Sequence, residues 1–193
     1  MKITSSYKVQ IKQYRHIFDD TVRIYRDAVD FLISVCLENW NEISALDGML
    51  LRKSYVENLI HKTKEHPHPK YEFDAVFYKF PSYLRRDAIA CAIGKVSSHK
   101  SSLSNWEASD MTTRGAEPGI PKAGFEFPCM YKTVMYQRTD EYSCKVKVWI
   151  RNTWDWISLQ LRKSDVDYIR RHCADRKECA PVLQKRGLSL IHI

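Results

Sequence analysis

Motifs that mark several common catalytic classes are absent from this chain of 193 residues. It contains no GxGxxG stretch, no phosphate-binding P-loop and no nucleophile elbow, so dinucleotide binding, nucleotide hydrolysis and serine-hydrolase chemistry have no sequence support. Its six cysteines include no CxxC pair, which leaves the usual zinc ligand set without a candidate. We therefore expect no metal site, no other cofactor and no catalytic residue in these residues.

Long apolar runs and a secretory signal are also missing. No apolar stretch approaches the length of a membrane span, and the opening "MKITSSYKVQIK" is polar and alternating. Two cysteines, Cys36 and Cys91, fall on apolar faces of predicted helices, where a thiol behaves as a small hydrophobic group. These features predict a cytoplasmic protein with reduced thiols and no membrane partner.

Positive charge is what the chain has in excess. Lys and Arg number 31 against 23 Asp and Glu, which gives a net charge of +8 and a pI near 9.2. The hydrophobic fraction of 44% is enough for a packed core. Such a basic excess favours a polyanionic partner, with nucleic acid ahead of a membrane surface.

Periodicity predicts an α+β fold in which helices interrupt a set of strands. Alternation in "SYKVQIKQYR" predicts an opening strand, with Tyr7, Val9 and Ile11 on its buried face. Apolar spacings of three and four predict helices at residues 17–43, 49–64 and 81–108. A Gly- and Pro-rich stretch follows, and then come strands at 130–137, 144–150 and 154–161 and a short helix from 163 that Ser164 caps. A lone strand is unstable, so we expect the opening strand to pair with the strands after Cys129.

The last two strands carry an unusual polar face. "KVKVWIR" sets Lys145, Lys147, Trp149 and Arg151 against a valine and isoleucine face, and "RNT" with Asn152 is a hairpin-turn candidate. In "WDWISLQLRK" the corresponding face holds Trp154, Trp156, Ser158, Gln160 and Arg162. Cations interleaved with indoles suit a phosphate backbone with stacked bases. The alternative is a solvated basic face with the tryptophans packed beneath the helices.

Several segments, in order along the chain, resemble the N-terminal part of TnpB-like (OrfB-type) proteins, RNA-guided DNA endonucleases of bacterial insertion sequences long described as transposases. These segments are "SYLRRDAIACAIGKVSSHKSSLSNWEA", "FPCMYKTVMYQ", "KVKVWIRNTWDWISLQLRKSDVDYI" and "CAPVLQKRG". The resemblance implies a small antiparallel β-barrel, the wedge domain, with an inserted helical recognition domain. We expect the first wedge strand at 1–14, the recognition domain at 15–114 and the rest of the wedge at 115–187.

The resemblance also implies partners, namely a guide RNA and target DNA. The cations that it suggests for RNA phosphates are Lys8, Lys12, Lys145, Lys147, Arg151 and Arg162, with Trp149 and Trp154 as stacking candidates. Tyr83, Arg85 and Arg86, at the start of the third helix, are candidates for DNA beside the target, where helix N-termini suit phosphate. A solvated first turn is the alternative for these arginines.

The family's chemistry lies in a RuvC-like nuclease domain, where three acidic residues hold magnesium, and in a zinc-binding insert with CxxC pairs. We find neither here and expect no cleavage by this chain, although the intact parent is expected to be an endonuclease. The chain closes with "LSLIHI", residues 188–193. This peptide is what translation of the transposon mosaic end, a DNA adapter used to build sequencing libraries, would give. We therefore expect an adapter artefact and a truncated chain. A stand-alone sequence-specific DNA-binding protein and a non-functional fragment remain as alternatives.

Overall fold

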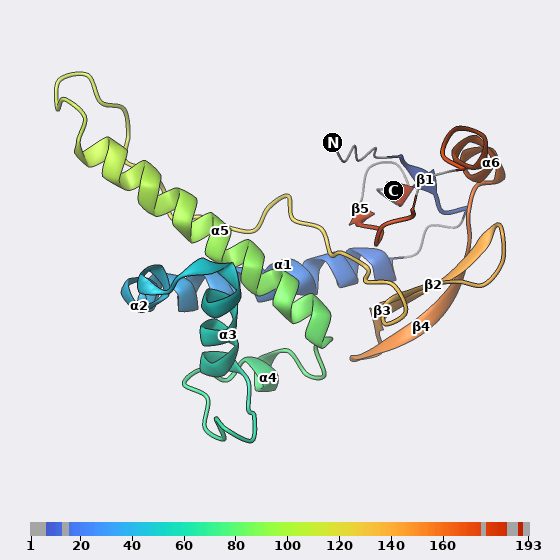
Figure 1. The fold of residues 1–193 in the computed structure, drawn as a ribbon, viewed down its shortest axis with the longest axis horizontal. Helices are drawn as coiled ribbons and strands as arrows, with labels where there is room; N and C mark the ends of the chain where they lie inside the picture. Colours follow the sequence, from blue (N-terminus) through green and yellow to red (C-terminus); the bar gives the residue numbers. More distant parts are fainter. Residues whose placement is uncertain (1–6, 13–15, 175–176, 185–188, 191–193) are drawn as a thin grey trace. The chain divides into compact units, whose positions relative to one another are not determined.

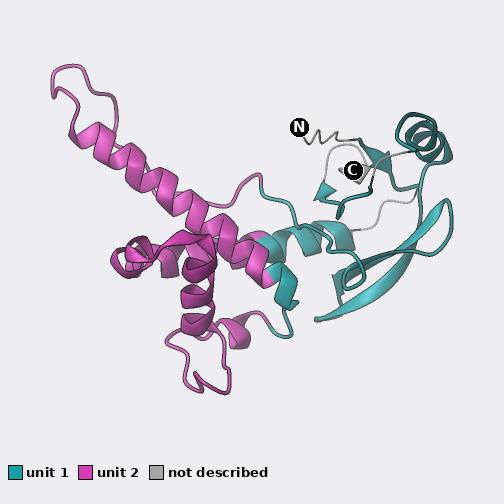
Figure 2. Cartoon of the chain, in the orientation of Figure 1, with its two compact units in different colours: residues 1–25, 78–84, 126–193 teal, residues 26–77, 85–125 magenta. Residues whose placement is uncertain are grey.

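The computed structural model of the chain describes residues 7–12, 16–174, 177–184 and 189–190. The fold is α+β, as the sequence predicts. The chain divides into two compact units (Figure 2): unit 1 comprises residues 1–25, 78–84 and 126–193, and unit 2 comprises residues 26–77 and 85–125. Within the described ranges, no helix is long and apolar enough to cross a membrane.

The strands of unit 1 form two antiparallel sheets of three strands (Figure 1). One sheet has the order β2-β3-β4 and the other has the order β1-β6-β5. The strands are β1 (Val9–Gln10), β2 (Tyr136–Arg138), β3 (Ser143–Ile150), β4 (Thr153–Gln160), β5 (Leu183–Gln184) and β6 (Ser189–Leu190). Among the described residues both sheets are open, and no closed barrel is present.

The β3–β4 hairpin is joined by a two-residue turn at Arg151 and Asn152. Both residues have positive φ, 49° and 59°, which is the conformation of a type I′ hairpin turn. The hairpin turn predicted at "RNT" with Asn152 is therefore confirmed, and Arg151 shares the positive φ. Such a turn matches the right-handed twist of the strands and fixes their register.

The opening strand lies beside the end of β4, as the sequence predicts. Ile11 and Leu161 form an antiparallel bridge. On either side of it, the Lys12 N–H donates to the Gln160 carbonyl at 2.9 Å and the Arg162 N–H donates to the Gln10 carbonyl at 2.8 Å. This pairing joins a segment from the start of the chain to one about 150 residues later.

Two expectations about unit 1 strands require correction or qualification. The predicted strand at 130–137 is confined to β2, because the Tyr131 carbonyl accepts hydrogen bonds from both Met135 and Tyr136 and closes a turn there. In the closing segment, which was expected to be an artefact, Ser189–Leu190 pairs between β1 and β5. Residues 188 and 191–193 of the expected artefact lie outside the described residues.

The helices are α1 (Ile17–Glu38), α2 (Trp40–Ala45), α3 (Gly48–Ile60), α4 (Phe73–Val76), α5 (Ser82–Glu107) and α6 (Lys163–His172). The single helix predicted over 17–43 is interrupted at Asn39. The buried Asn39 amide donates to the Val35 carbonyl at 2.7 Å and to the Tyr71 hydroxyl oxygen at 2.8 Å, and such side-chain bonds compete with the helical backbone.

The core of unit 2 lies between α1, α3, α4 and α5. The rings of Phe31, Phe73 and Phe77 pack edge-on or tilted, with centroids 4.7–5.8 Å apart, an arrangement that aromatic pairs favour. On α5, Ile89 and Ile93 are fully buried. Lys95, on the same helix, instead uses its amine to donate to the Lys122 carbonyl at 3.2 Å.

The start of α6 also differs from the prediction. The residue before its first turn is Arg162, and no side chain caps the helix. The Ser164 hydroxyl instead accepts a hydrogen bond from Arg162 Nε at 2.9 Å. The first turn is tied to β1, because the Asp165 carboxylate accepts the Gln10 N–H at 2.9 Å. Ser164 as the cap was therefore wrong, and Asp165 provides the local anchor.

Candidate nucleic-acid interface

The register of β2, β3 and β4 brings the polar positions of the three strands onto one face. Lys145 is paired with Gln137 on one side and Ser158 on the other, and Lys147 is paired with Trp156. Because side chains alternate along a strand, these residues point to the same side of the sheet. The opposite side holds buried residues such as Cys144 and its partner Leu159, which form the core face.

The opening strand extends this polar face. Ile11 and Leu161 are directly opposite each other and are 4% and 0% exposed. Their neighbours Lys12, Gln160 and Arg162 therefore project to the other side, in line with Ser158. We call the resulting surface the cation face. It consists of Lys8, Lys12, Gln137, Lys145, Lys147, Trp149, Trp156, Ser158, Gln160 and Arg162.

The predicted RNA-binding lysines are accessible on this face. Lys8, Lys12 and Lys145 are exposed, Lys147 is partly exposed, and Arg151 is exposed at the hairpin turn beside the face. Within the described part of the chain, no ion pair engages any of these five residues. Their charges are thus available to an external anion.

Arg162 differs from the lysines, because it is already engaged. Its guanidinium lies 3.3 Å from the Asp165 carboxylate, and its Nη1 donates to Gln10 Oε1 at 2.5 Å. These contacts link β1 to the start of α6. Arg162 is exposed and stays a candidate for phosphate contact, but its first role in the fold is structural.

Trp154 lies on the predicted side of β4 but is not accessible. It is 7% exposed, and its ring packs against Phe80 at 5.4 Å and against Trp149 at 5.7 Å between centroids. Its indole Nε1 is buried without a hydrogen-bond partner among the described residues. A buried indole cannot stack on a base, so we withdraw Trp154 as a stacking candidate. Trp149 remains partly exposed and is retained.

Trp156 is the aromatic residue that our selection from the sequence missed. It is partly exposed, lies on the cation face and pairs directly with Lys147. The alternation of β4 already placed Trp156 on this face. The length of the turn could have identified Trp156 from the sequence. A two-residue turn fixes the register, which pairs Trp154 with Trp149 at the hairpin end and places Trp156 beside Lys147.

The three predicted DNA-binding residues have different surroundings. Tyr83, in unit 1, is 46% exposed and its ring packs against Tyr131 at 5.4 Å. Arg85, in unit 2, is 5% exposed, and its Nη2 donates to Glu57 Oε1 at 2.9 Å. Arg86 is exposed and donates to the other Glu57 oxygen at 3.3 Å. Arg85 is therefore a structural residue and the prediction that it contacts DNA is withdrawn, whereas Tyr83 and Arg86 stay predictions.

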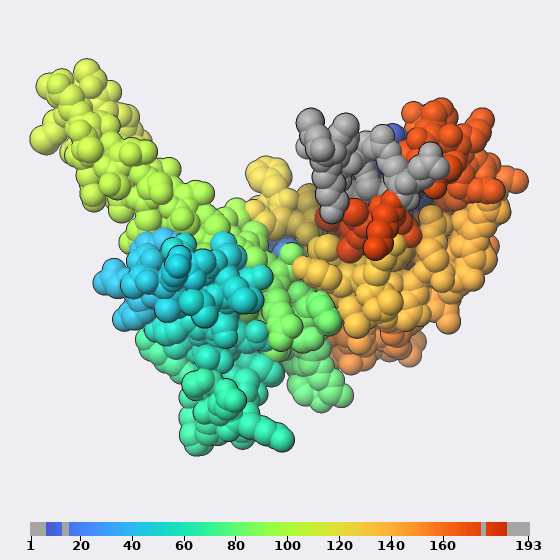
Figure 3. Space-filling view, viewed as in Figure 1, coloured from blue at the N-terminus to red at the C-terminus, as the bar shows by residue number. Residues whose placement is uncertain are grey.

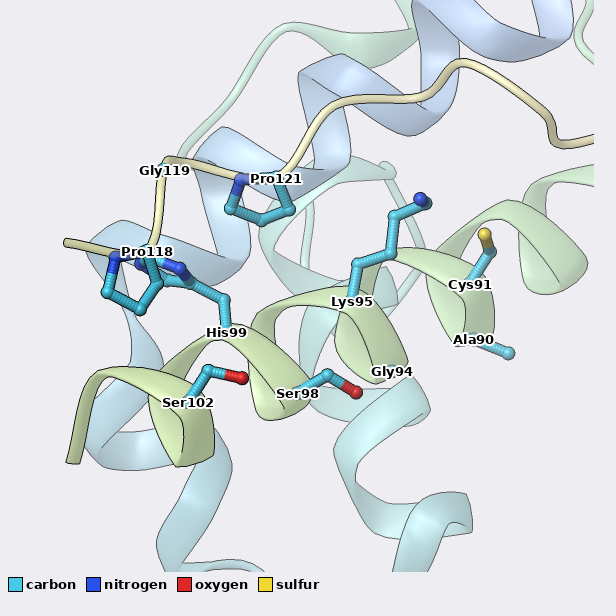
Figure 4. A pocket seen from close by; sticks show the side chains of 10 residues that line it. All are labelled: Ala90, Cys91, Gly94, Lys95, Ser98, His99, Ser102, Pro118, Gly119 and Pro121. Carbon is cyan, nitrogen blue, oxygen red and sulfur yellow. The ribbon is translucent and has the colours of Figure 1, made fainter. Parts of the chain in front are cut away.

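A separate groove lies in unit 2 between one face of α5 and residues 118–121 (Figure 4). Its volume is about 470 Å³, and Gly94, Lys95, Ser98, His99 and Ser102 line its helical wall. None of the predicted binding residues lines this groove. In the described ranges no group of three or more His, Cys, Asp or Glu side chains is arranged to hold a metal ion.

Two buried thiols have strongly altered acidity. Burial raises the pKa of Cys36 to about 12 and the pKa of Cys144 to about 11, because desolvation disfavours the thiolate. Cys36 is fully buried and Cys144 is 1% exposed. Both thiols therefore act as small apolar core groups instead of nucleophiles or metal ligands.

The structure thus defines an α+β protein with a basic and aromatic sheet face. A family model described as the Aq_aa04 family matches residues 3–150, and the chain belongs to this family. A relative from Aquifex aeolicus (strain VF5), with the name "Uncharacterized protein aq_aa04", is 27% identical over 135 residues, which cover 64% of this chain and 76% of the relative. No solved structure matches the chain. Neither name states an activity.

Proposed function

We propose that the protein binds structured RNA, with the sugar-phosphate backbone lying along the cation face of unit 1. The observation that carries this proposal is the register that brings Lys12 of the opening strand to the same side of the sheet as Lys145 and Lys147 of β3. Lysine ammonium groups neutralise phosphates and release counterions. Trp149 and Trp156 add ring surfaces on which a base or ribose can pack.

We further propose that the protein serves as the wedge and recognition part of a TnpB-like RNA-guided DNA endonuclease, in the cytoplasm. The RNA is then a guide, and target DNA is the second partner. Two further antiparallel pairings outside the named strands support the wedge assignment. They are the single bridges Ile11–Leu161 and Cys129–Val182. The Met130 N–H donates to the Pro181 carbonyl at 2.7 Å, which strengthens the second connection. These links favour a barrel-like closure of the strands.

The test of RNA binding is a filter-binding titration at several salt concentrations with a structured RNA. The double variant Lys145→Gln/Lys147→Gln removes two positive charges from the cation face. We expect weaker binding at every salt concentration, and a log–log salt slope shallower by about 1.5 to 2, because each lysine–phosphate contact contributes somewhat less than one unit to that slope.

The matched control is Lys62→Gln/Lys64→Gln, which removes the same charge from two exposed positions of unit 2. We expect this control to keep the slope of the unmodified protein. Equal slopes in both variants would mean that net charge, not the cation face, drives binding. Salt-insensitive binding by the unmodified protein would refute the proposal outright.

A duplex DNA competitor in the same titration addresses the alternative of a stand-alone DNA-binding protein. We expect unlabelled RNA to displace the bound structured RNA more readily than a DNA duplex of equal length does. For catalysis, we expect a matched DNA target to stay intact with the protein, guide RNA and magnesium. Cleavage under these conditions would contradict a purely binding role.

A further inference from the structure

Helix α6 carries a column of aromatic rings at its junction with the opening strand. The rings of Tyr168 and His172 are stacked, with centroids 4.1 Å apart and an interplanar angle of 24°. The ring of Tyr7 lies 5.9 Å from that of Tyr168 at an angle of 54°. We call these three residues the ring column. Tyr168 is 47% exposed and His172 is also exposed, so the column ends in solvent at the imidazole.

The column is held rigidly. His172 Nδ1 lies 2.8 Å from the Tyr168 carbonyl oxygen, and because a carbonyl only accepts, Nδ1 must carry the hydrogen. That bond fixes the tautomer and the orientation of the imidazole ring. The opposite side of α6 is anchored by Val166 and Cys173, which are 3% and 7% exposed. A ring that is fixed before binding loses little conformational entropy when a ligand stacks on it.

Positive charge accompanies the column. The last turn of α6 contains Arg170, Arg171 and His172. Arg170 pairs with Glu141, whereas Arg171 is exposed and uses its Nε to donate to the Asp167 carbonyl at 3.2 Å. In the part of the chain that the structure describes, no carboxylate pairs with Arg171. Its guanidinium is therefore available to a phosphate next to the imidazole.

We infer that the ring column is a binding site for an unpaired nucleobase of a single-stranded nucleic acid. The base stacks on the outer face of His172 and continues the column, while Arg171 contacts the adjoining phosphate. This inference deepens the proposed RNA binding but concerns another surface, because Tyr7 and Lys8 alternate to opposite sides of the opening strand. Figure 1 shows α6 beside β1, and Figure 3 shows α6 (orange-red) on the outer surface of the protein.

The experiment uses a single-stranded RNA octamer with one 2-aminopurine, whose fluorescence is quenched when the base stacks on a ring. We expect quenching with the unmodified protein and with His172→Phe, which keeps a ring. His172→Ala should abolish the quenching and weaken binding about tenfold, within the range for loss of one stacked base. His66→Ala, at an exposed loop histidine of unit 2, is the matched control and should behave like the unmodified protein.

Two comparisons make the result decisive. An octamer that is abasic at the probe position should bind the unmodified protein and His172→Ala equally well, because only stacking distinguishes them. Unchanged quenching with His172→Ala, or loss of quenching with His172→Phe as well, would overturn the ring column as a stacking site. Lys145→Gln/Lys147→Gln should keep the quenching while binding structured RNA more weakly, so failure of this inference is separable from failure of the proposed function.

Discussion

Replacing Glu57 by glutamine tests the ion pair that connects α3 to α5 in unit 2. Arg85 is 5% exposed, and its guanidinium contacts Glu57 at 2.9 Å. The other nearby carboxylate, Asp74, is 3.9 Å away with a side chain 44% exposed. Glu57→Gln keeps the side-chain shape but leaves the buried guanidinium without its close counter-charge.

Leaving one member of a buried ion pair uncompensated costs about 3–5 kcal/mol. Because Asp74 still provides part of the counter-charge, we expect a loss near the lower end, about 3 kcal/mol. For a chain of this size that corresponds to a fall in melting temperature of roughly 6–12 °C. Circular dichroism with heating and a urea titration measure the two quantities.

The double variant Glu57→Gln/Arg85→Met separates ion pairing from packing. Replacing both charged partners by groups of similar volume is often close to neutral, so we expect the double variant to recover most of the lost stability. A change in melting temperature of under about 2 °C for Glu57→Gln alone would refute the structural role assigned to Arg85. It would also reopen Arg85 as a contact for DNA.

Three further predictions concern single positions. Gly94→Ala should stabilise unit 2 by about 0.5–1 kcal/mol in urea titrations, because the added methyl group meets open space within α5. Asn152→Ala should destabilise the β3–β4 hairpin by about 1 kcal/mol, since φ is 59° there. The free energy of unfolding should fall as the pH rises from about 9 toward 11, because the unfolded Cys144 thiol ionises while burial raises its folded pKa to about 11. The slope is at most about 1.4 kcal/mol per pH unit for one such group, and Cys144→Ala should reduce it.

The hairpin shows how far the sequence alone reaches. Alternation predicted both faces of β3 and β4, because the side-chain period of a strand is two and the turn contains only two residues. Pairing of the opening strand with later strands also followed, because a single strand needs a partner. Alternation could not predict which other part of the chain packs against each face of the hairpin. Phe80, more than seventy positions earlier in the chain, seals Trp154.

Arg85 illustrates the same limit in a helix. Within α5 it is one of two adjacent arginines in a polar first turn, a pattern that suits either solvent or phosphate. Its actual partner, Glu57, is 28 positions away, and local periodicity contains no information about such a contact. Asn39 is comparable, since its amide interrupts the predicted helix partly through Tyr71, 32 positions further on.

Burial of Trp154 changes what the cation face is expected to recognise. With that indole packed against Phe80 and Trp149, the accessible face is dominated by ammonium groups, and its aromatic surface is reduced to partly exposed rings. Ammonium groups contact phosphates, and such contacts do not distinguish one base from another. Binding at the cation face should therefore depend strongly on salt and weakly on RNA sequence. We expect most of any preference for unpaired bases to come from the ring column, because its terminal imidazole is exposed, fixed in orientation and next to an arginine.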